Sequence, residues 1–450
     1  MSFEAIVVGG GFTGMSAAAA LAARGAKVRV FESSKSTDPR FRGELIHPRG
    51  VRGLEELGLK APLFASGGVA VNGFAVSPAA HEKVTLLPYA QGQGPGLGID
   101  HPAMVLTMRA EVARRRNVTV TTGERITDVV RARGRVLGVK SADGTEHRAD
   151  LVVVADGRQS KLRPLLGLEP EVKLLSYTVV VGVSGELPHG PLGHVFLGAP
   201  GPILAYPYGA SRIRFCIDVP LDAARGREAM IKLITEQYAP HVPGALGEAM
   251  VSALKSQPFE GCANHAISTQ NCAAAGVVLV GDAGGCSHPL TATGMTNAVN
   301  DALTLSAFVG ARGPDNQALS DYQRARYDFV RMRELFTDAL YEVFRGQDAG
   351  SKALQGGVFR YWASSERRRE ASMGILSGEE LRVSRFVAEY SRVFGISAVQ
   401  VMKRLAFEPI VGSSHLKSLA TTSFGRLGEA AARTKRKLVD RYRLELHQLP

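Results

Sequence analysis

The segment Val7–Gly14, VVGGGFTG, decides the fold of this chain of 450 residues. It joins an apolar, β-branched run, Phe3–Val8, to an Ala-rich segment, Gly14–Arg24, which is predicted to be helical. Its GxGxxG spacing permits a tight turn and lets the backbone approach a pyrophosphate at the helix N-terminus. A second strand, Lys27–Phe31, ends at Glu32, where an acid accepts hydrogen bonds from ribose hydroxyls. We therefore predict a dinucleotide-binding βαβ unit, with a structural glycine turn as the alternative.

A second segment places an acid after a short apolar strand near residue 280. The strand Val277–Val280 delivers Asp282 at its C-terminal end, where the carboxylate is a candidate partner for the ribityl chain of a flavin. A loop carrying Pro289 leads to another predicted helix, which begins near Gly294. The free N–H groups of that helix would favour negative charge on the pyrimidine edge of a reduced flavin. The alternative is that Asp282 is a simple N-cap or turn residue.

The third segment, VVVADGRQSKLR, again puts a polar turn after a buried strand. Asp156 and Gly157 follow the apolar strand Leu151–Ala155. Arg163 is a candidate ion-pair partner for Asp156, and the pair would hold the loop between FAD and a pyridine nucleotide. The alternative is a structural turn with a local ion pair.

Composition excludes several classes of protein. With 45% hydrophobic and 21% charged residues, the chain is not disordered, collagen-like or a coiled coil. Its 4 cysteines show no CxxC spacing, so we expect reduced thiols in a cytoplasmic protein and no metal site. The length predicts two or three domains.

Half of the net charge of +12 lies in the last 50 residues, which hold ten Lys and Arg against four Asp and Glu. Apolar and basic side chains interleave there on a predicted helix. A basic C-terminal helix is a candidate for peripheral contact with the inner face of a membrane. A solvated helical face is the alternative, and no motif supports binding of nucleic acid.

The three motifs, in this order, resemble the group A flavoprotein monooxygenases, which share the fold of p-hydroxybenzoate hydroxylase. The resemblance covers about residues 1–310. Within that group the segments Arg42–Gly50, RGELIHPRG, and His288–Thr291, HPLT, resemble the squalene monooxygenase branch. Two positions depart from that pattern: His47 stands where Gln is usual, and Thr293 where Gly is usual.

The resemblance implies an α/β fold in three parts. A Rossmann-type FAD-binding domain would comprise residues 1–70, 99–171 and 266–320. A substrate domain built on a mostly antiparallel sheet would comprise residues 71–98 and 172–265. A C-terminal helical region would follow at residues 321–450.

The resemblance also implies a set of site residues. FAD would be held by Gly9, Gly11, Phe12, Thr13, Gly14, Glu32, Arg42, Arg109, Ile126, Asp156, Asp282, Pro289, Gly294 and Met295. The substrate pocket would be lined by Phe196, Tyr206, Tyr208, Phe215 and Leu290, for which plain core packing is the alternative. His47 is the candidate catalytic group, either bonding a substrate oxygen or relaying a proton, and a structural histidine is the alternative.

The implied activity is monooxygenation with FAD, NADH or NADPH, and O₂. The cofactor carries this chemistry, so the lack of a nucleophile or paired-carboxylate motif is expected. We expect epoxidation or hydroxylation of a lipophilic substrate, such as an isoprenoid or a prenylated aromatic compound of the quinolone type in secondary metabolism. The alternative is a flavin-dependent reductase of isoprenoid double bonds, similar to geranylgeranyl reductases. The single tryptophan, Trp362, argues against a flavin halogenase.

Overall fold

The computed structural model describes residues 2–37, 43–78, 83–223, 226–269, 271–407, 414–415, 417–421 and 448–449. Its first sheet has six strands in the order β18-β19-β12-β1-β2-β8, all parallel except β18. The strands are β1 (Glu4–Val8), β2 (Lys27–Glu32), β8 (Val118–Thr122), β12 (Leu151–Val154), β18 (Ala273–Ala274) and β19 (Val277–Leu279). Their near-continuous apolar sequences are explained by packing on both faces.

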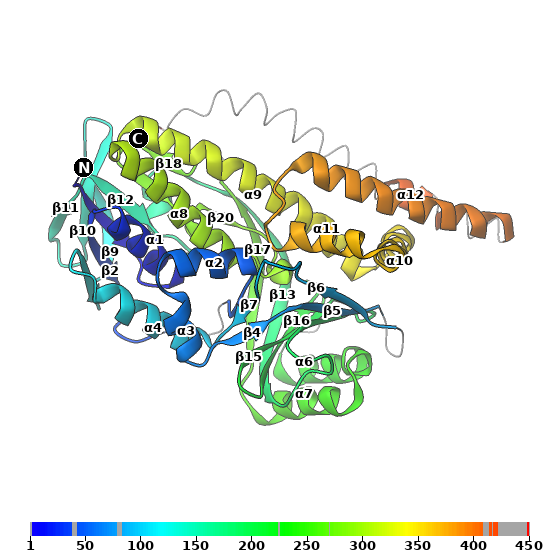
Figure 1. Ribbon diagram of the computed structural model, residues 1–450. Helices are drawn as coiled ribbons and strands as arrows, with labels where there is room; N and C mark the ends of the chain where they lie inside the picture. The colour runs from blue at the N-terminus through cyan, green and yellow to red at the C-terminus, as the bar shows by residue number, and fades with distance from the viewer. Residues whose placement is uncertain are drawn as a thin grey trace.

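The helices that pack on this sheet form one apolar core with it. The helices of this core are α1 (Phe12–Ala23), α2 (Pro48–Glu56), α3 (Lys60–Ala65), α4 (His101–Ala113), α5 (Leu162–Leu165) and α8 (Gly294–Arg312). A three-stranded sheet, β11-β10-β9, packs on the same core and is formed by β9 (Ile126–Ala132), β10 (Arg135–Ser141) and β11 (Glu146–Arg148). The confirmed fold is therefore an α/β, Rossmann-type unit (Figure 1).

The strands between residues 118 and 148 belong to two different sheets. Their alternation of apolar and polar residues is typical of a single meander, but β8 pairs in parallel with β2 at the edge of the large sheet. Only β9, β10 and β11 form the meander. Alternation reports a half-buried strand, and the same pattern is produced by a sheet edge and by a meander.

The second sheet has eight strands in the order β20-β17-β13-β16-β15-β14-β5-β6, antiparallel except where β14 meets β5. The strands are β5 (Gly73–Ser77), β6 (Thr85–Pro88), β13 (Glu171–Ser184), β14 (Gly193–Phe196), β15 (Ile203–Gly209), β16 (Arg212–Val219), β17 (Glu260–Ser268) and β20 (Gly285–Cys286). A small sheet, β3-β7-β4, lies between the two large ones and consists of β3 (Leu45–Ile46), β4 (Val69–Val71) and β7 (Gly96–Gly98).

Alternate residues of the eight-stranded sheet face two different cores. One face packs on α6 (Arg227–Gln237) and α7 (Gly244–Ser256), which lie at the bottom of Figure 1. The other face packs on helices of the C-terminal region. We propose that the expected three-part domain division follows these sheets and helices.

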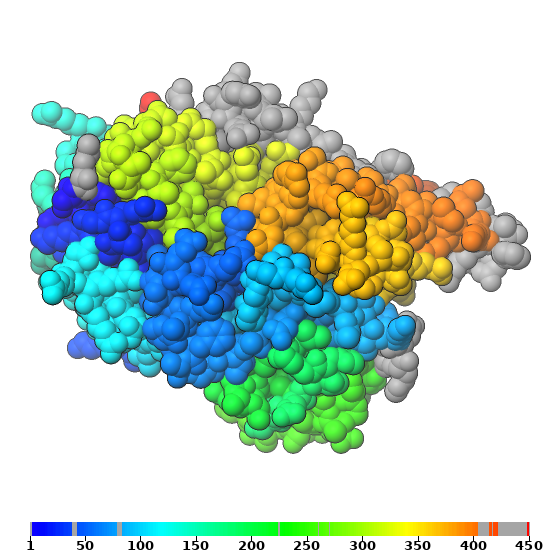
Figure 2. All heavy atoms as spheres, in the orientation of Figure 1, coloured from blue at the N-terminus to red at the C-terminus, as the bar shows by residue number. Residues whose placement is uncertain are grey.

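The C-terminal region is helical. It consists of α9 (Asn316–Arg345), α10 (Ala349–Ser364), α11 (Glu366–Leu376) and α12 (Val383–Phe407). Helix α9 runs along the first sheet and onto the second, α10 and α11 lie against β6, and the end of α12 projects beyond both sheets (Figures 1 and 2). Across the described helices, none combines the length and apolarity needed to cross a bilayer.

Candidate functional site

A cavity of about 910 Å³ lies between the two large sheets and collects most of the predicted cofactor residues. Those that line it are Gly9, Gly11, Phe12, Thr13, Glu32, Arg109, Ile126, Asp156, Asp282, Pro289, Gly294 and Met295. Gly14 lies beneath the glycine turn, and Arg42 lies outside the described residues. The structure thus brings three distant motifs to one cavity, while their role in holding FAD stays a prediction.

The glycine turn between β1 and α1 is shaped by steric contacts. A Cβ atom at Gly14 would overlap the carbonyl oxygen of Gly9, and Gly9 itself has a φ of +106°, which favours glycine. Helix α1 begins at Phe12, and no described side chain caps it. Its first N–H groups are therefore available to an anion in the cavity.

Glu32 and Arg109 fix the far side of this turn. The backbone N–H of Gly10 donates to Oε2 of Glu32 at 2.7 Å, and Nε of Arg109 donates to the carbonyl of Gly10 at 2.7 Å. Nη2 of Arg109 lies 3.3 Å from the same Oε2. Oε1 of Glu32 accepts from the N–H of Ser34 at 2.8 Å and from the hydroxyl of Ser33 at 3.3 Å, so a ligand hydroxyl would compete with the longer Ser33 contact.

The turn after β12 differs from its prediction. Arg163 forms no ion pair with Asp156; it donates instead to the carbonyls of Ala283 at 3.0 Å and Arg158 at 3.2 Å. It therefore ties the turn after β12 to the turn after β19. Oδ2 of Asp156 accepts from the N–H of Lys161 at 2.9 Å, whereas its buried Oδ1 has no partner in the described part of the chain. Burial raises the pKa of Asp156.

These features fit the FAD that the resemblance implies. The uncapped N-terminus of α1 offers donors to a pyrophosphate, and the carboxylates of Glu32 and Asp282 offer acceptors to sugar and ribityl hydroxyls. Helix α8 begins at Gly294 without a side-chain cap among the described residues, so its positive end also faces the cavity. The unpartnered Oδ1 of Asp156 marks a further polar contact that a ligand could complete.

The wall opposite the cofactor residues comes from the eight-stranded sheet. Leu204 and Tyr206 of β15 and Cys216 and Asp218 of β16 line the cavity, together with Leu290. Tyr206 and Leu290 therefore line the cavity, and their contact with a substrate stays a prediction.

Three of the expected pocket residues are not on the cavity. Phe196 and Phe215 point to the opposite face of the sheet and pack in the core formed with α6 and α7. Tyr208 lies on the cavity side, but the guanidinium groups of Arg212 and Arg214 each lie 4.2 Å from its ring centroid, and it does not line the cavity. Adjacent residues of a strand face opposite sides, so aromatic character alone did not identify the face.

An ion pair missed by the sequence argument closes this end of the cavity. Nε and Nη2 of Arg214 each donate to the buried carboxylate of Glu44 at 2.8 Å. Burial raises the pKa of Glu44, and the hydrogen bond from Arg214 opposes that effect. The hydroxyl of Tyr206 lies 3.5 Å from the same carboxylate, so this wall is held by a charged network.

His47 is not a cavity residue, which corrects its predicted catalytic role. The side chain is fully buried, and its Nε2 donates to the carbonyl of Thr291 at 2.8 Å. Nδ1 then accepts from the hydroxyl of Tyr89 at 2.7 Å. Both ring nitrogens are engaged, so His47 ties the start of α2 to the turn at Pro289–Thr291.

This burial predicts a pH-dependent stability. It lowers the pKa of His47 from 6.5 to about 4, so the unfolded chain takes up a proton at higher pH than the folded chain. The stabilisation is complete above pH 6.5 and is lost as the pH falls toward 4. Between pH 7 and pH 5 the wild type should lose about 2 kcal/mol more than His47→Gln, as measured by urea unfolding.

The matched comparison isolates the residue. Burial also lowers the pKa of His194 to about 4, but His194 is present in both proteins and its contribution cancels. If the wild type and His47→Gln lost the same unfolding free energy between pH 7 and pH 5, the folded protein would accept a proton on His47 as readily as the unfolded chain.

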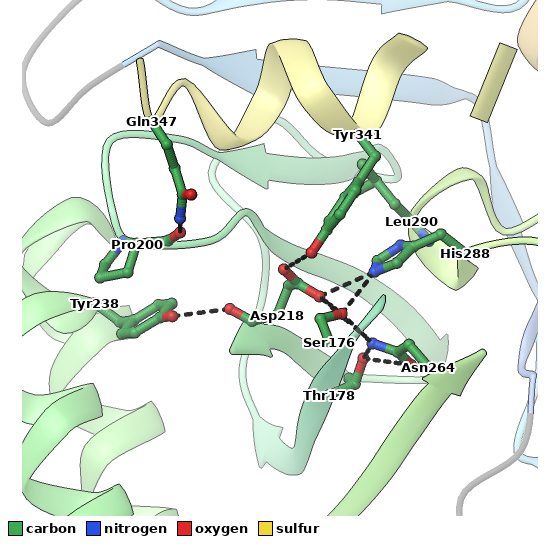
Figure 3. Close-up of polar contacts among 10 residues, drawn as sticks. All are labelled: Ser176, Thr178, Pro200, Asp218, Tyr238, Asn264, His288, Leu290, Tyr341 and Gln347. Carbon is green, nitrogen blue, oxygen red and sulfur yellow. Dashed lines mark hydrogen bonds and ion pairs between the residues drawn. The ribbon is translucent and has the colours of Figure 1, made fainter. Parts of the chain in front are cut away.

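Two buried polar groups were also missed. Asp301 and Arg326 form an ion pair behind the turn after β19, with side chains 1% and 5% exposed. Asp218 forms the second group with a set of donors from remote parts of the chain, namely Ser176, Asn264, His288 and Tyr341 (Figure 3). Each carboxylate is the only acidic residue of its element: Asp218 lies in the strand RIRFCIDV, and Asp301 lies in α8. A single acid within a mostly apolar element was the signal that could have revealed both groups.

Comparison with known families agrees with this geometry. Residues 148–415 match the squalene epoxidase family, and residues 7–56 match an NAD(P)-binding Rossmann-like domain. Squalene epoxidase erg1 of Schizosaccharomyces pombe is 27% identical over 416 residues, which is 87% of this chain and 89% of that protein. Squalene epoxidase 3 of Arabidopsis thaliana is 30% identical over 417 residues, covering 88% and 79% of the two chains.

A solved structure shares the fold. HpxO of Klebsiella pneumoniae, in complex with FAD and uric acid, superposes with a TM-score of 0.72 at 25% identity. The match covers 83% of this chain and 97% of HpxO.

Proposed function

The chain belongs to the squalene epoxidase family, and from this premise we propose that it inserts one oxygen atom of O₂ into an isoprenoid or a prenylated aromatic compound. It is an FAD-dependent monooxygenase that draws electrons from NADH or NADPH. Bound FAD supplies the electron transfer and the activation of O₂. The residues of this chain supply binding, orientation and exclusion of water.

One observation carries the proposal: a single cavity joins the glycine turn of α1 to the start of α8 and to the wall formed by β15. A ligand that reaches from Gly11 to Gly294 would present its far end to Leu204 and Tyr206. We propose that the predicted cofactor residues hold FAD along this path, and that the substrate takes the remaining space against β15.

The composition of the wall supports a lipophilic substrate. Leu204, Tyr206 and Leu290 offer apolar surface, and Met295 lies on the cofactor side. The polar groups at this wall are already bonded to one another, as in the contact of Arg214 with Glu44. Such a wall suits a largely apolar molecule oriented by a few polar contacts.

The test begins with the purified protein, which should be yellow and should take up FAD. Candidate isoprenoids and prenylated quinolones are then assayed for consumption of NADPH and O₂ and for product mass. The expected result is one oxygen atom added per O₂ consumed. Turnover that proceeds under nitrogen, with a saturated double bond in the product, would overturn the proposal in favour of a reductase.

A membrane-bound supply of substrate is a further part of the proposal. The basic tail lies mostly outside the described residues, so its sequence alone supports this step. Changing Lys435, Lys437, Arg441 and Arg443 to Gln should weaken binding to anionic vesicles at least tenfold, since each charge contributes about 1 kcal/mol. Co-sedimentation measures the binding, with zwitterionic vesicles as the control. Equal binding of both proteins to anionic vesicles would remove the membrane step.

A further inference from the structure

Arg333, in the middle of α9, is a buried cation that lines the cavity. Its side chain is 9% exposed. Nε donates to the hydroxyl of Ser287 at 3.2 Å. With the amide of Asn297 turned to satisfy both neighbours, Nη1 donates to its oxygen at 3.2 Å, and Asn297 donates to the carbonyl of Thr293 at 3.1 Å. Nη2 is buried and has no partner within the described residues.

Among the described residues no carboxylate lies within ion-pair distance of Arg333, and its hydrogen-bond partners are neutral. The carboxylates of the adjacent Glu334 and of Asp301, which is paired with Arg326, act on it only from a longer distance. Arg326, two turns earlier on the same helix, provides the contrast, because Asp301 lies 2.9 Å from its Nε. Arginine stays protonated in proteins, and a buried charge without a counter-ion is costly. The fold therefore keeps an unpaired positive charge at the cavity, which is most easily explained if a ligand carries the negative charge.

The position of Arg333 indicates which ligand group this is. Ser287, which accepts from Arg333, and Thr293, which accepts from Asn297, line the cavity beside Gly294. Helix α8 begins at Gly294 with its N-terminal N–H groups uncapped by the described side chains, so a partial positive charge adds to that of Arg333. Nearby Asp282 lies 4.0 Å from Arg158, and Asp218 accepts from several donors, so neither carboxylate serves Arg333.

We propose that Arg333 stabilises the negative charge that the isoalloxazine of bound FAD acquires on reduction. A hydride, carrying two electrons and one proton, passes from NADPH to FAD, which leaves NADP⁺ and an anionic reduced flavin. The inference rests on the proposed function only in that FAD occupies this cavity; it is independent of the substrate. Arg333 thereby raises the reduction potential of the flavin.

The experiment uses the FAD-loaded enzyme and two readouts that need no turnover. Sulfite adds to the oxidised isoalloxazine and leaves it negatively charged, so its dissociation constant reports positive charge at the ring. Arg333→Met should weaken sulfite binding at least tenfold. It should also lower the potential, measured by dye-coupled reduction, by about 30 mV for each tenfold change. Arg333→Lys, which keeps the charge, should restore most of both.

Controls separate this role from a structural one. Arg331→Met changes an arginine of the same helix that does not line the cavity, and it should leave sulfite binding and potential unchanged. If Arg333→Met does not retain FAD, the sulfite affinity and reduction potential of Arg333→Gln are compared with those of Arg333→Lys instead. Unchanged sulfite affinity and reduction potential in the uncharged variants would overturn the proposal. If in addition the KM for acidic substrates rose, Arg333 would bind the substrate and not the flavin. A protein that never binds FAD would refute the proposed function instead.

Discussion

Asp301→Ala should lower the free energy of unfolding by about 3–5 kcal/mol, because it leaves Arg326 buried without a counter-ion. Oδ2 of Asp301 accepts from Nε of Arg326 at 2.9 Å and from the N–H of Gly281 at 2.8 Å. Arg326 in turn donates to the carbonyl of Gly284 at 2.9 Å. The pair thus holds the turn that carries Asp282, and the variant should also lose FAD. Urea unfolding and the FAD content of the purified protein measure the two effects.

The double variant Asp301→Leu with Arg326→Met provides the control. It removes both charges and fills similar volume, so part of the lost stability should return. The recovery is incomplete because the N–H of Gly281 loses its acceptor and the carbonyl of Gly284 keeps the hydroxyl of Thr269 but loses Arg326. A cost below about 1 kcal/mol for Asp301→Ala would show that water reaches Arg326 and that the pair is not truly buried.

The parts of the site that lie close together in sequence could be predicted well. The glycine turn, Glu32 and the strand ends at Asp156 and Asp282 follow from local patterns, because βαβ geometry fixes where the C-terminal end of a strand lies. The family and its cofactor followed from the order of these motifs, and comparison with known proteins confirmed both.

The predictions that were wrong concern which side of a strand or which atoms of a side chain face the site. Phe215 and Cys216 are adjacent in β16, yet only Cys216 lines the cavity. Both faces of this sheet are buried, so the usual contrast of polar and apolar faces, which reveals orientation, is absent. His47 failed for a related reason, since its position near the site said nothing about whether its ring nitrogens were free.

Contacts between distant segments could not be foreseen at all. Asp218 of the second sheet meets Tyr341 of α9, 123 residues later, and His288 of the loop at residues 286–291, 70 residues later. No sequence period links these positions. Their meeting shows how α9 and the Pro289–Thr291 turn are fixed to the sheet that forms one wall of the cavity.

Asp218→Ala should therefore be strongly destabilising, by at least 3 kcal/mol, because four donors lose one acceptor. Figure 3 shows their convergence: Tyr341 donates to Oδ2 at 3.0 Å, and Ser176 donates to Oδ1 at 2.5 Å. Oδ1 also lies 3.0 Å from Nε2 of His288, whose Nδ1 accepts from the N–H of Leu290. Nε2 of His288 thus carries the proton. Urea unfolding measures the loss.

The effect should spread to α9 and to the loop at residues 286–291, because His288 and Tyr341 both depend on this carboxylate. Hydrogen exchange should rise at residues 286–291 and 337–345 in Asp218→Ala, ahead of global unfolding. Tyr341→Phe removes only one donor and should cost about 1.5–3 kcal/mol, with faster exchange in α9 alone. If the two variants destabilised the protein equally, Asp218 would serve only the contact with α9, and the network would not join three parts of the chain.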